Sequence, residues 1–474
     1  MSVWRRKYHN RELMYCMLII ISFVTLLSKE VSAGEAMSLR AAVQYALENN
    51  HEIVASMNSL AASKEDIGIA RSNLMPKLTL EERFLRTNNP TYVFMSKMNQ
   101  GRFTMQDFDI NVLNDPAPEN DFQTSFAVFQ PLLALQASIG LDMSRTAYAA
   151  KKEEYFRKQE AVALQVAQAY LMAQMAEEYI HVVQKGVEDA AEHLRIATVS
   201  YKNGLGLYAD TLRAATAVTE AEQKMVSAEK NFKVAQRSLA LLLGLEQSIK
   251  TDADDLDLML HNLDYYTGTL EERRDIQAMQ LYFENARNTL KLNEAAYIPT
   301  LGVGSSYQLN DEEIPFGSDG ESWQVFALFK WELFDGFKRK HERQQAQYRI
   351  AETREQLTGL IDAATFQIYE SFLEVEEAEK NSELARSALA TAEEGQRLVR
   401  IRYENALSPL VDLLDAQMSL EQARTNVLVR QKEQQLAILK LYFESGIILQ
   451  ELGVEAISPE NNTPPTDQDA AGGE

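Results

Sequence analysis

Residues 402–416 read "RYENALSPLVDLLDA", and residues 200–214, 202 positions earlier, read "SYKNGLGLYADTLRA". In both stretches a tyrosine precedes a short turn, and a second run that carries an aspartate follows it. The two copies differ where Asp415 in the second corresponds to Arg213 in the first. Such a repeat indicates that one structural unit occurs twice in the chain.

Further pairs of residues extend the repeat to both sides of this stretch. Pro76 precedes Pro299 by 223 positions, whereas Phe129 precedes Phe329 by 200. The offset changes because the segment after the first proline contains a long loop, roughly 87–121. The counterpart of this loop, roughly 310–321, is shorter.

The sequence therefore predicts a duplicated unit of helix, strand, strand, long helix and helix. The first repeat covers 34–243 and the second covers 271–446, joined by an acidic linker at 244–270. The predicted elements are helices 38–75 and 271–297, strands 77–86, 122–130, 300–309 and 322–331, and long helices that continue to 243 and 446.

The long helix of the second repeat, from about 337 to 402, shows the clearest periodicity. Apolar and small residues alternate spacings of three and four, and the small ones recur every seven: Ala364, Ser371, Ala378, Ala385 and Ala392. A seven-residue repeat is typical of left-handed coiled-coil packing. Such a helix is about 100 Å long, which favours an elongated molecule. Periodicity alone also fits a soluble coiled-coil rod.

The predicted strands argue against a rod. Apolar and small or polar residues alternate over 300–309 and 322–331, and each strand has about the length that crosses a bilayer at a tilt. In 77–86 the alternation is less regular because Glu82 lies among Leu78, Leu80 and Phe84. Four strands cannot close a membrane barrel, so several chains must contribute to one. A soluble four-stranded sheet packed on helices is the alternative.

The ends and the charge of the chain narrow its class. Residues 1–33 combine basic residues, an apolar run and a small-residue site, as in a signal peptide, and they contain the only cysteine, Cys16. The tail 447–474 is predicted to be largely disordered. With 47 basic and 69 acidic side chains, the net charge of -22 argues against a nucleic-acid partner.

The sequence resembles the TolC family of outer-membrane efflux channels over about 38–446. The resemblance rests on the duplicated unit, Pro76 and Pro299, the turns "YKNGL" and "YENAL", and "LVDLLDAQMSLEQA" at 410–423. It implies a mainly α protein that forms a homotrimer. A twelve-stranded β-barrel in outer-membrane lipid would continue as a twelve-helix coiled-coil barrel across the periplasm of a Gram-negative bacterium.

The resemblance also implies a function. The trimer would be a passive exit duct of a tripartite efflux or type I secretion system, and a periplasmic adaptor would connect it to an inner-membrane transporter. Drugs, metal ions and polypeptides remain open as cargo. The alternative is a soluble or surface coiled-coil scaffold without channel activity.

The site residues lie around the two turns. Asp412 and Asp415, three apart on one helix face, can form stacked acidic rings that select cations. The alternative for Asp412 is a structural role, in which its negative charge complements the positive end of the helix dipole. The resemblance gives Tyr403 and Asp210 a contact that holds the closed state. The resemblance assigns the last two helices of the second repeat to an inner pair and those of the first repeat to an outer pair. Ser408 stands where the family can have a basic residue, and we expect Arg213 to pair with an aspartate of the inner pair instead.

The turns themselves follow from residue type. Gly204 and Gly206 are predicted to end one helix, while Ser408 caps the next one with Pro409 at its first position. With Ala406, which stands where the family often has glycine, the turns are the expected docking surface for the adaptor.

The sequence shows no sign of an enzyme, a cofactor or a metal centre. It contains no phosphate-binding loop, nucleophile elbow or HExxH motif, and its six histidines are scattered. The acidic run at 251–257 lacks the glycine and the glutamate of an EF-hand. Met95, Met98 and Met105 in the first loop favour a partly apolar surface loop over a soft-metal site.

Overall fold

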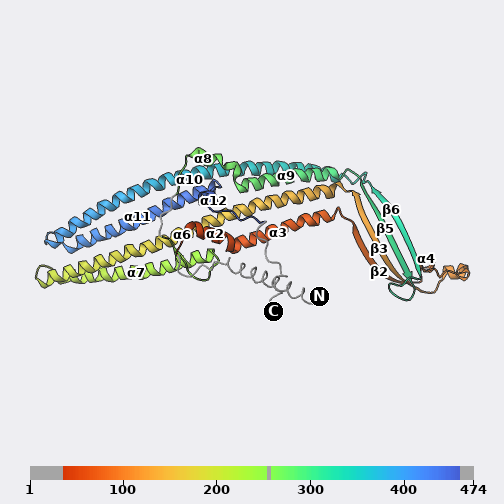
Figure 1. Cartoon of the computed structure of the whole chain (residues 1–474), viewed down its shortest axis with the longest axis horizontal. Helices are drawn as coiled ribbons and strands as arrows, with labels where there is room; N and C mark the ends of the chain where they lie inside the picture. The colour runs from red at the N-terminus through yellow and green to blue at the C-terminus, as the bar shows by residue number, and fades with distance from the viewer. Residues whose placement is uncertain (1–35, 253–257, 460–474) are drawn as a thin grey trace, which may run out of the picture.

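The computed structural model describes residues 36–252 and 258–459. The predicted signal peptide, most of the acidic run at 251–257 and the last residues of the tail lie outside these ranges. Figure 1 shows an elongated molecule with a small sheet at one end and long helices that run away from it. The helices end in two hairpin tips, α6/α7 and α10/α11, at the opposite end.

The first repeat contains β1 (Ala36–Met37), α2 (Leu39–Asn49), α3 (His51–Ser72), β2 (Lys77–Thr87), α4 (Pro90–Asn99), η1 (Met105–Phe108), α5 (Ile110–Asn114), β3 (Glu119–Leu133), α6 (Leu135–Lys202) and α7 (Tyr208–Leu242). After β4 (Lys250–Thr251), α8 (Leu263–Gly268) and η2 (Leu270–Glu272), the second contains α9 (Arg274–Ala295), β5 (Thr300–Asp311), β6 (Gly320–Lys330), α10 (Lys338–Glu404) and α11 (Leu410–Glu444), followed by α12 (Ile448–Glu451).

The long helices follow the predicted seam. Helices α6 and α10 contain 68 and 67 residues, which corresponds to about 100 Å each. The buried residues of α10 repeat at spacings of three, four and seven: Ala364, Ile368, Ser371, Val375, Ser382 and Ala385. Among the helices that the structure describes, none is long and apolar enough to cross a membrane.

The four long strands form one antiparallel sheet in the order β2-β3-β5-β6. The register places Leu80, Phe126, Tyr307 and Trp323 side by side in one row. The adjacent row, on the opposite face, contains Glu81, Ser125, Gln308 and Ser322. The sheet therefore has one apolar face and one polar face, as the alternation predicts.

Glu82, which interrupts the predicted alternation, has a cross-strand explanation. It lies on the apolar face opposite Thr124, whose hydroxyl donates a hydrogen bond to its carboxylate at 2.5 Å. The pair gives one of the two carboxylate oxygens a hydrogen bond, while the other, Oε1, is buried without a partner among the described residues.

The predicted helix 38–75 is wrong in one respect, because the structure contains two helices there. The chain breaks at Asn50, which has an extended backbone. Its side chain accepts a hydrogen bond from the amide of Glu52 at 2.8 Å and donates one to the carbonyl of Leu242 at 2.7 Å. Asparagine competes for backbone groups in this way, so it begins a new helix rather than continuing the old one.

Other predicted boundaries also shift. In the second repeat, α9 begins at Arg274 rather than at 271, because Arg273 has an extended backbone. Strand β3 spans Glu119–Leu133, longer than the predicted 122–130. The first long loop contains α4, η1 and α5, and the three methionines singled out above, Met95, Met98 and Met105, are exposed there.

The linker 244–270 and the start of the tail 447–474 are more ordered than their composition predicts. Strand β4 of the linker pairs in parallel with β1, and Tyr266 is fully buried. In the tail, Ile448 is fully buried, and the side-chain amide of Gln159 donates to the carbonyl of Ile457 and accepts from its amide. A few apolar residues in these polar segments pack into the core formed by the helices. Their burial orders the segments even though the average composition of the segments is polar.

Candidate functional site

The two hairpin turns have the same backbone geometry. After α6 the amide of Leu205 donates to the carbonyl of Ser200 at 2.9 Å, and after α10 the amide of Leu407 donates to that of Arg402 at 2.8 Å. The residue before each donor is left-handed, with φ +73° at Gly204. This is the C-terminal motif that glycine favours. Gly206 is tightly enclosed, because an added Cβ would lie 3.1 Å from Ser200 and Tyr201.

The second turn uses an alanine in the same conformation. Ala406 has φ +56°, which is strained for any residue with a Cβ. The predicted cap is wrong, because Pro409 occupies the N-cap position of α11 and no side chain caps the helix. The hydroxyl of Ser408 is buried and finds no hydrogen-bond partner among the residues that the structure describes. Its position one residue before the cap places it too far back to reach the first helical amides.

A small apolar cluster joins the two hairpins at the tip. Ala197 of α6, Ala214 of α7, and Leu410 and Leu413 of α11 form its buried centre. Leu194, Val399, Tyr403 and Leu414 pack against that centre. The cluster includes residues of both hairpins, so it opposes their separation.

The predicted gate residues lie around this cluster. Tyr403 is half-buried, and burial together with the nearby Asp210 carboxylate raises the pKa of its hydroxyl. The structure thus brings these two side chains together, although no hydrogen bond joins them within the described chain. Asp412 and Asp415 are exposed on α11, on the side opposite the buried Leu410 and Leu413.

Arg213 is exposed on α7 and forms no ion pair with either aspartate within the described part of one chain. The expected pairing of Arg213 with an inner aspartate therefore does not occur inside a single chain. Among residues 36–252 and 258–459, no group of three or more His, Cys, Asp or Glu side chains is arranged to hold a metal ion.

Sequence reasoning missed a buried polar layer between the hairpins, one or two turns behind the tip cluster. Gln417 of α11 donates to Asp189 of α6 at 3.0 Å, and Arg424 donates to the same carboxylate at 3.2 Å. Gln396 of α10 donates to Gln417 at 3.1 Å. His193 is 2% exposed and lies 3.4 Å from Gln417. Burial lowers the pKa of this imidazole. Polar residues at seam positions, such as Gln396, were the available signal.

Two further polar contacts hold α11 to α6. Lys432 pairs with Glu178 at 2.9 Å and donates to Gln174 at 3.2 Å. At the end of α11, Arg157 donates to the carbonyl of Phe443 at 2.9 Å and its guanidinium lies 3.8 Å from the Phe443 ring centroid.

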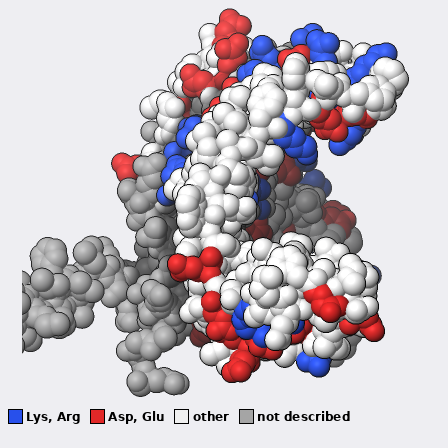
Figure 2. All heavy atoms as spheres, turned by 90° about the vertical axis from the view of Figure 1, so that its right-hand side faces the viewer, with Lys and Arg blue, Asp and Glu red and all other residues white. Residues whose placement is uncertain are grey.

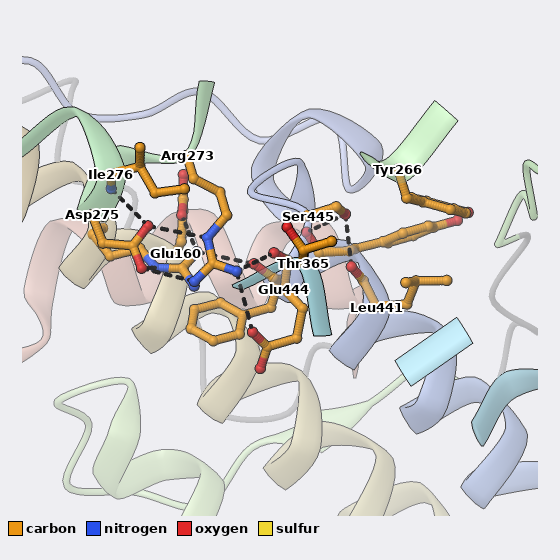
Figure 3. Close-up of polar contacts among 12 residues, drawn as sticks. Glu160, Tyr266, Arg273, Asp275, Ile276, Thr365, Leu441, Glu444 and Ser445 are labelled. Carbon is orange, nitrogen blue, oxygen red and sulfur yellow. Dashed lines mark hydrogen bonds and ion pairs between the residues drawn. The ribbon is translucent and has the colours of Figure 1, made fainter. Parts of the chain in front are cut away.

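Figure 3 shows the group that fixes this end of α11 to α9. Arg273 is 3% exposed, donates to the carbonyl of Glu444 at 2.8 Å, and binds both oxygens of Asp275 at 3.1 and 2.7 Å. Burial raises the pKa of Glu160 against the opposing effect of Arg157. The hairpin α10/α11 is therefore anchored by buried ionic groups at one end and by a small apolar cluster at its tip.

Comparisons with known proteins agree with this architecture. The family described as "outer membrane efflux protein" matches residues 42–245 and 266–446. The outer membrane protein OprJ of Pseudomonas aeruginosa is 20% identical over 86% of this chain and 84% of its own length. The outer membrane protein TolC of Escherichia coli is 22% identical over 93% of this chain and 90% of its own.

A solved membrane protein from Pseudomonas aeruginosa has the same fold, with a TM-score of 0.74 at 18% identity, covering 86% of this chain and 90% of that one. These matches favour a channel over a soluble coiled-coil scaffold. Because the family match covers both repeats, the chain belongs to the outer membrane efflux protein family and is a TolC-like exit duct of the outer membrane.

Proposed function

We propose that three copies of this chain assemble into one duct that opens and closes at its helical tip. The unpaired outer edges of β2 and β6 support this assembly, because an open sheet edge cannot face lipid. Three sheets would supply about twelve strands, enough to enclose a lumen. The apolar face of each sheet would contact outer-membrane lipid, and the polar face would line the lumen.

The observation that supports a gate at the helical tip is the placement of Asp412 and Asp415. Both carboxylates point away from the cluster that joins the hairpins, and neither forms an ion pair within residues 36–252 and 258–459. In a threefold assembly this face of α11 would meet its two copies near the axis. Two stacked rings of three carboxylates would then attract cations and repel anions.

The remaining residues of the tip have roles in this scheme. Tyr403 and Asp210 would bond when the hairpins close together, since they already lie close. Arg213 would pair with an inner aspartate of a neighbouring chain, which its exposure permits. The turns at Gly204, Gly206, Ala406 and Pro409 would receive a periplasmic adaptor, which would connect the duct to an inner-membrane transporter.

Single-channel recording in a planar bilayer tests the proposal, with wild type compared to Asp412→Ala/Asp415→Ala. We expect discrete cation-selective openings whose selectivity falls in the double variant. Unchanged selectivity would assign the two aspartates to helix stability instead. An Arg213→Ala channel with the conductance of wild type would contradict the pairing across chains.

A further inference from the structure

The long loop between β2 and β3 is built onto the polar face of the sheet. Helix α4 ends at Asn99, and the carbonyl of Asn99 lies where a side chain of Gly320 would be: an added Cβ would approach it to 1.8 Å. Gly320 pairs with Asn310, and both belong to the polar row of their strands. The end of α4 therefore presses on the backbone of β6 from the polar side.

Gln100, the residue after α4, fixes this position. Its side chain is 1% exposed and donates to the carboxylate of Asp121 at 3.0 Å and to the carbonyl of Asn120 at 2.9 Å. Asn310 donates to the same carboxylate at 2.9 Å. Asp121 and Asn310 are 4% and 1% exposed. A fully hydrogen-bonded polar group of this kind holds one geometry, because breaking its bonds would leave buried donors and acceptors without partners.

Ion pairs tie the rest of the loop to the same face. Lys97 pairs with Asp107 at 3.1 Å and with Glu119 at 3.0 Å. Arg102 pairs with Glu119 at 3.1 Å and also contacts Glu312, which lies in the loop between β5 and β6. Figure 2 looks onto this end of the molecule and shows acidic and basic side chains intermingled with uncharged surface. The β2–β3 loop and the β5–β6 loop thus form one body with the end of the sheet.

We propose that residues 88–118 form a lid over the extracellular mouth of the lumen and limit the size of molecules that pass there. The proposal rests on the assembly proposed above, in which the polar face of the sheet lines the lumen. A barrel of about twelve strands tilted by about 40° is about 24 Å across between backbones. One helix with its side chains is about 10 Å wide, so three copies of α4 on the inner wall would cover most of the mouth.

The test measures access to the lumen from outside the cell, which does not depend on the tip. In a parent carrying Cys16→Ser, one reporter is Gln324→Cys, on the polar face about 13 Å below Gly320. Its neighbour Val325→Cys, on the apolar face, is the matched control. Intact cells are treated with a small charged thiol reagent, or with a maleimide that carries a long polyethylene glycol chain.

Each reporter substitution is then combined with a second change that displaces or removes the lid. Gly320→Ala forces the end of α4 away from the sheet, and Gly359→Ala is its control, since an added Cβ there meets nothing within 4 Å. Deletion of residues 91–117 is a second way to remove the lid. Heat-resistant oligomers on gels show which variants assemble.

We expect the small reagent to label Gln324→Cys and not Val325→Cys in every background. The large reagent should label Gln324→Cys about tenfold faster with Gly320→Ala or the deletion than with Gly359→Ala. Equal rates of large-reagent labelling with and without the lid would overturn the lid alone. Labelling of Val325→Cys instead of Gln324→Cys by the small reagent would overturn the proposed barrel.

Discussion

Leu413 is the residue whose truncation should weaken the tip most directly. Its side chain on α11 is fully buried in a cluster with Ala197 of α6 and Ala214 of α7. Replacing a buried leucine with alanine typically costs about 2–5 kcal/mol. The tip can partly collapse around the vacated space, so we expect the lower end, about 2 kcal/mol per chain. A loss of this size shifts the balance between joined and separated hairpins by about 30-fold.

The assay is planar-bilayer recording of purified oligomers carrying Leu413→Ala. The matched control is Val411→Ala, two residues away, whose side chain is 43% exposed. Such a surface change should alter stability by less than about 0.5 kcal/mol. We expect Leu413→Ala channels to spend a much larger fraction of time open than the control. Equal open fractions in two equally well assembled variants would refute the view that this cluster holds the hairpins together.

Three further predictions concern strain, the buried anchor and protonation. Ala406→Gly should stabilise the protein by about 1 kcal/mol, and Gly204→Ala should destabilise it similarly, because both positions are left-handed; unfolding in denaturant measures both, and equal stabilities would contradict the strain. Arg273→Ala should cost about 1–3 kcal/mol, because the carbonyl of Glu444 loses its buried donor and Asp275 keeps only the longer ion pair with Arg157 at 4.0 Å, seen as a loss of folded protein in the membrane fraction. Arg273→Lys should restore only part of it, because an ammonium cannot bind both carboxylate oxygens as a guanidinium does. Burial lowers the pKa of His193 below its ordinary 6.5, so the unfolded chain binds the proton first and stability falls as pH drops below that value. His193→Gln should remove this part of the pH dependence in thermal melts, and an unchanged pH profile would exclude the imidazole as its source.

The elements of the fold could be predicted because their patterns are local. Buried positions of α10 such as Ala364, Ser371 and Ala385 fall on the predicted seven-residue seam. The alternation of β5 and β6 gave the two faces of the sheet, and the glycine at Gly204 marked the end of α6. Local pattern failed at Asn50 and in the linker, where a side-chain hydrogen bond or a distant core decides the backbone.

The candidate site divides in the same way. The face of α11 that carries Asp412 and Asp415 follows from their spacing, and the proximity of Tyr403 to Asp210 was expected only from the family resemblance. The polar layer of Asp189, His193 and Gln417 was not predicted, although all three lie in long regular helices.

The sequence by itself determined the duplication, the helical seam and the two-faced strands, because each depends on residues a few positions apart. Only the tertiary structure decided which helix faces meet and at what height. Periodicity specifies the buried stripe of a helix but not how far it slides along its neighbour. That height is set by remote contacts, such as Arg273 with Glu444. Remote contacts also bring together Gln100 and Asp311, which are 211 positions apart in the sequence, at the end of the sheet.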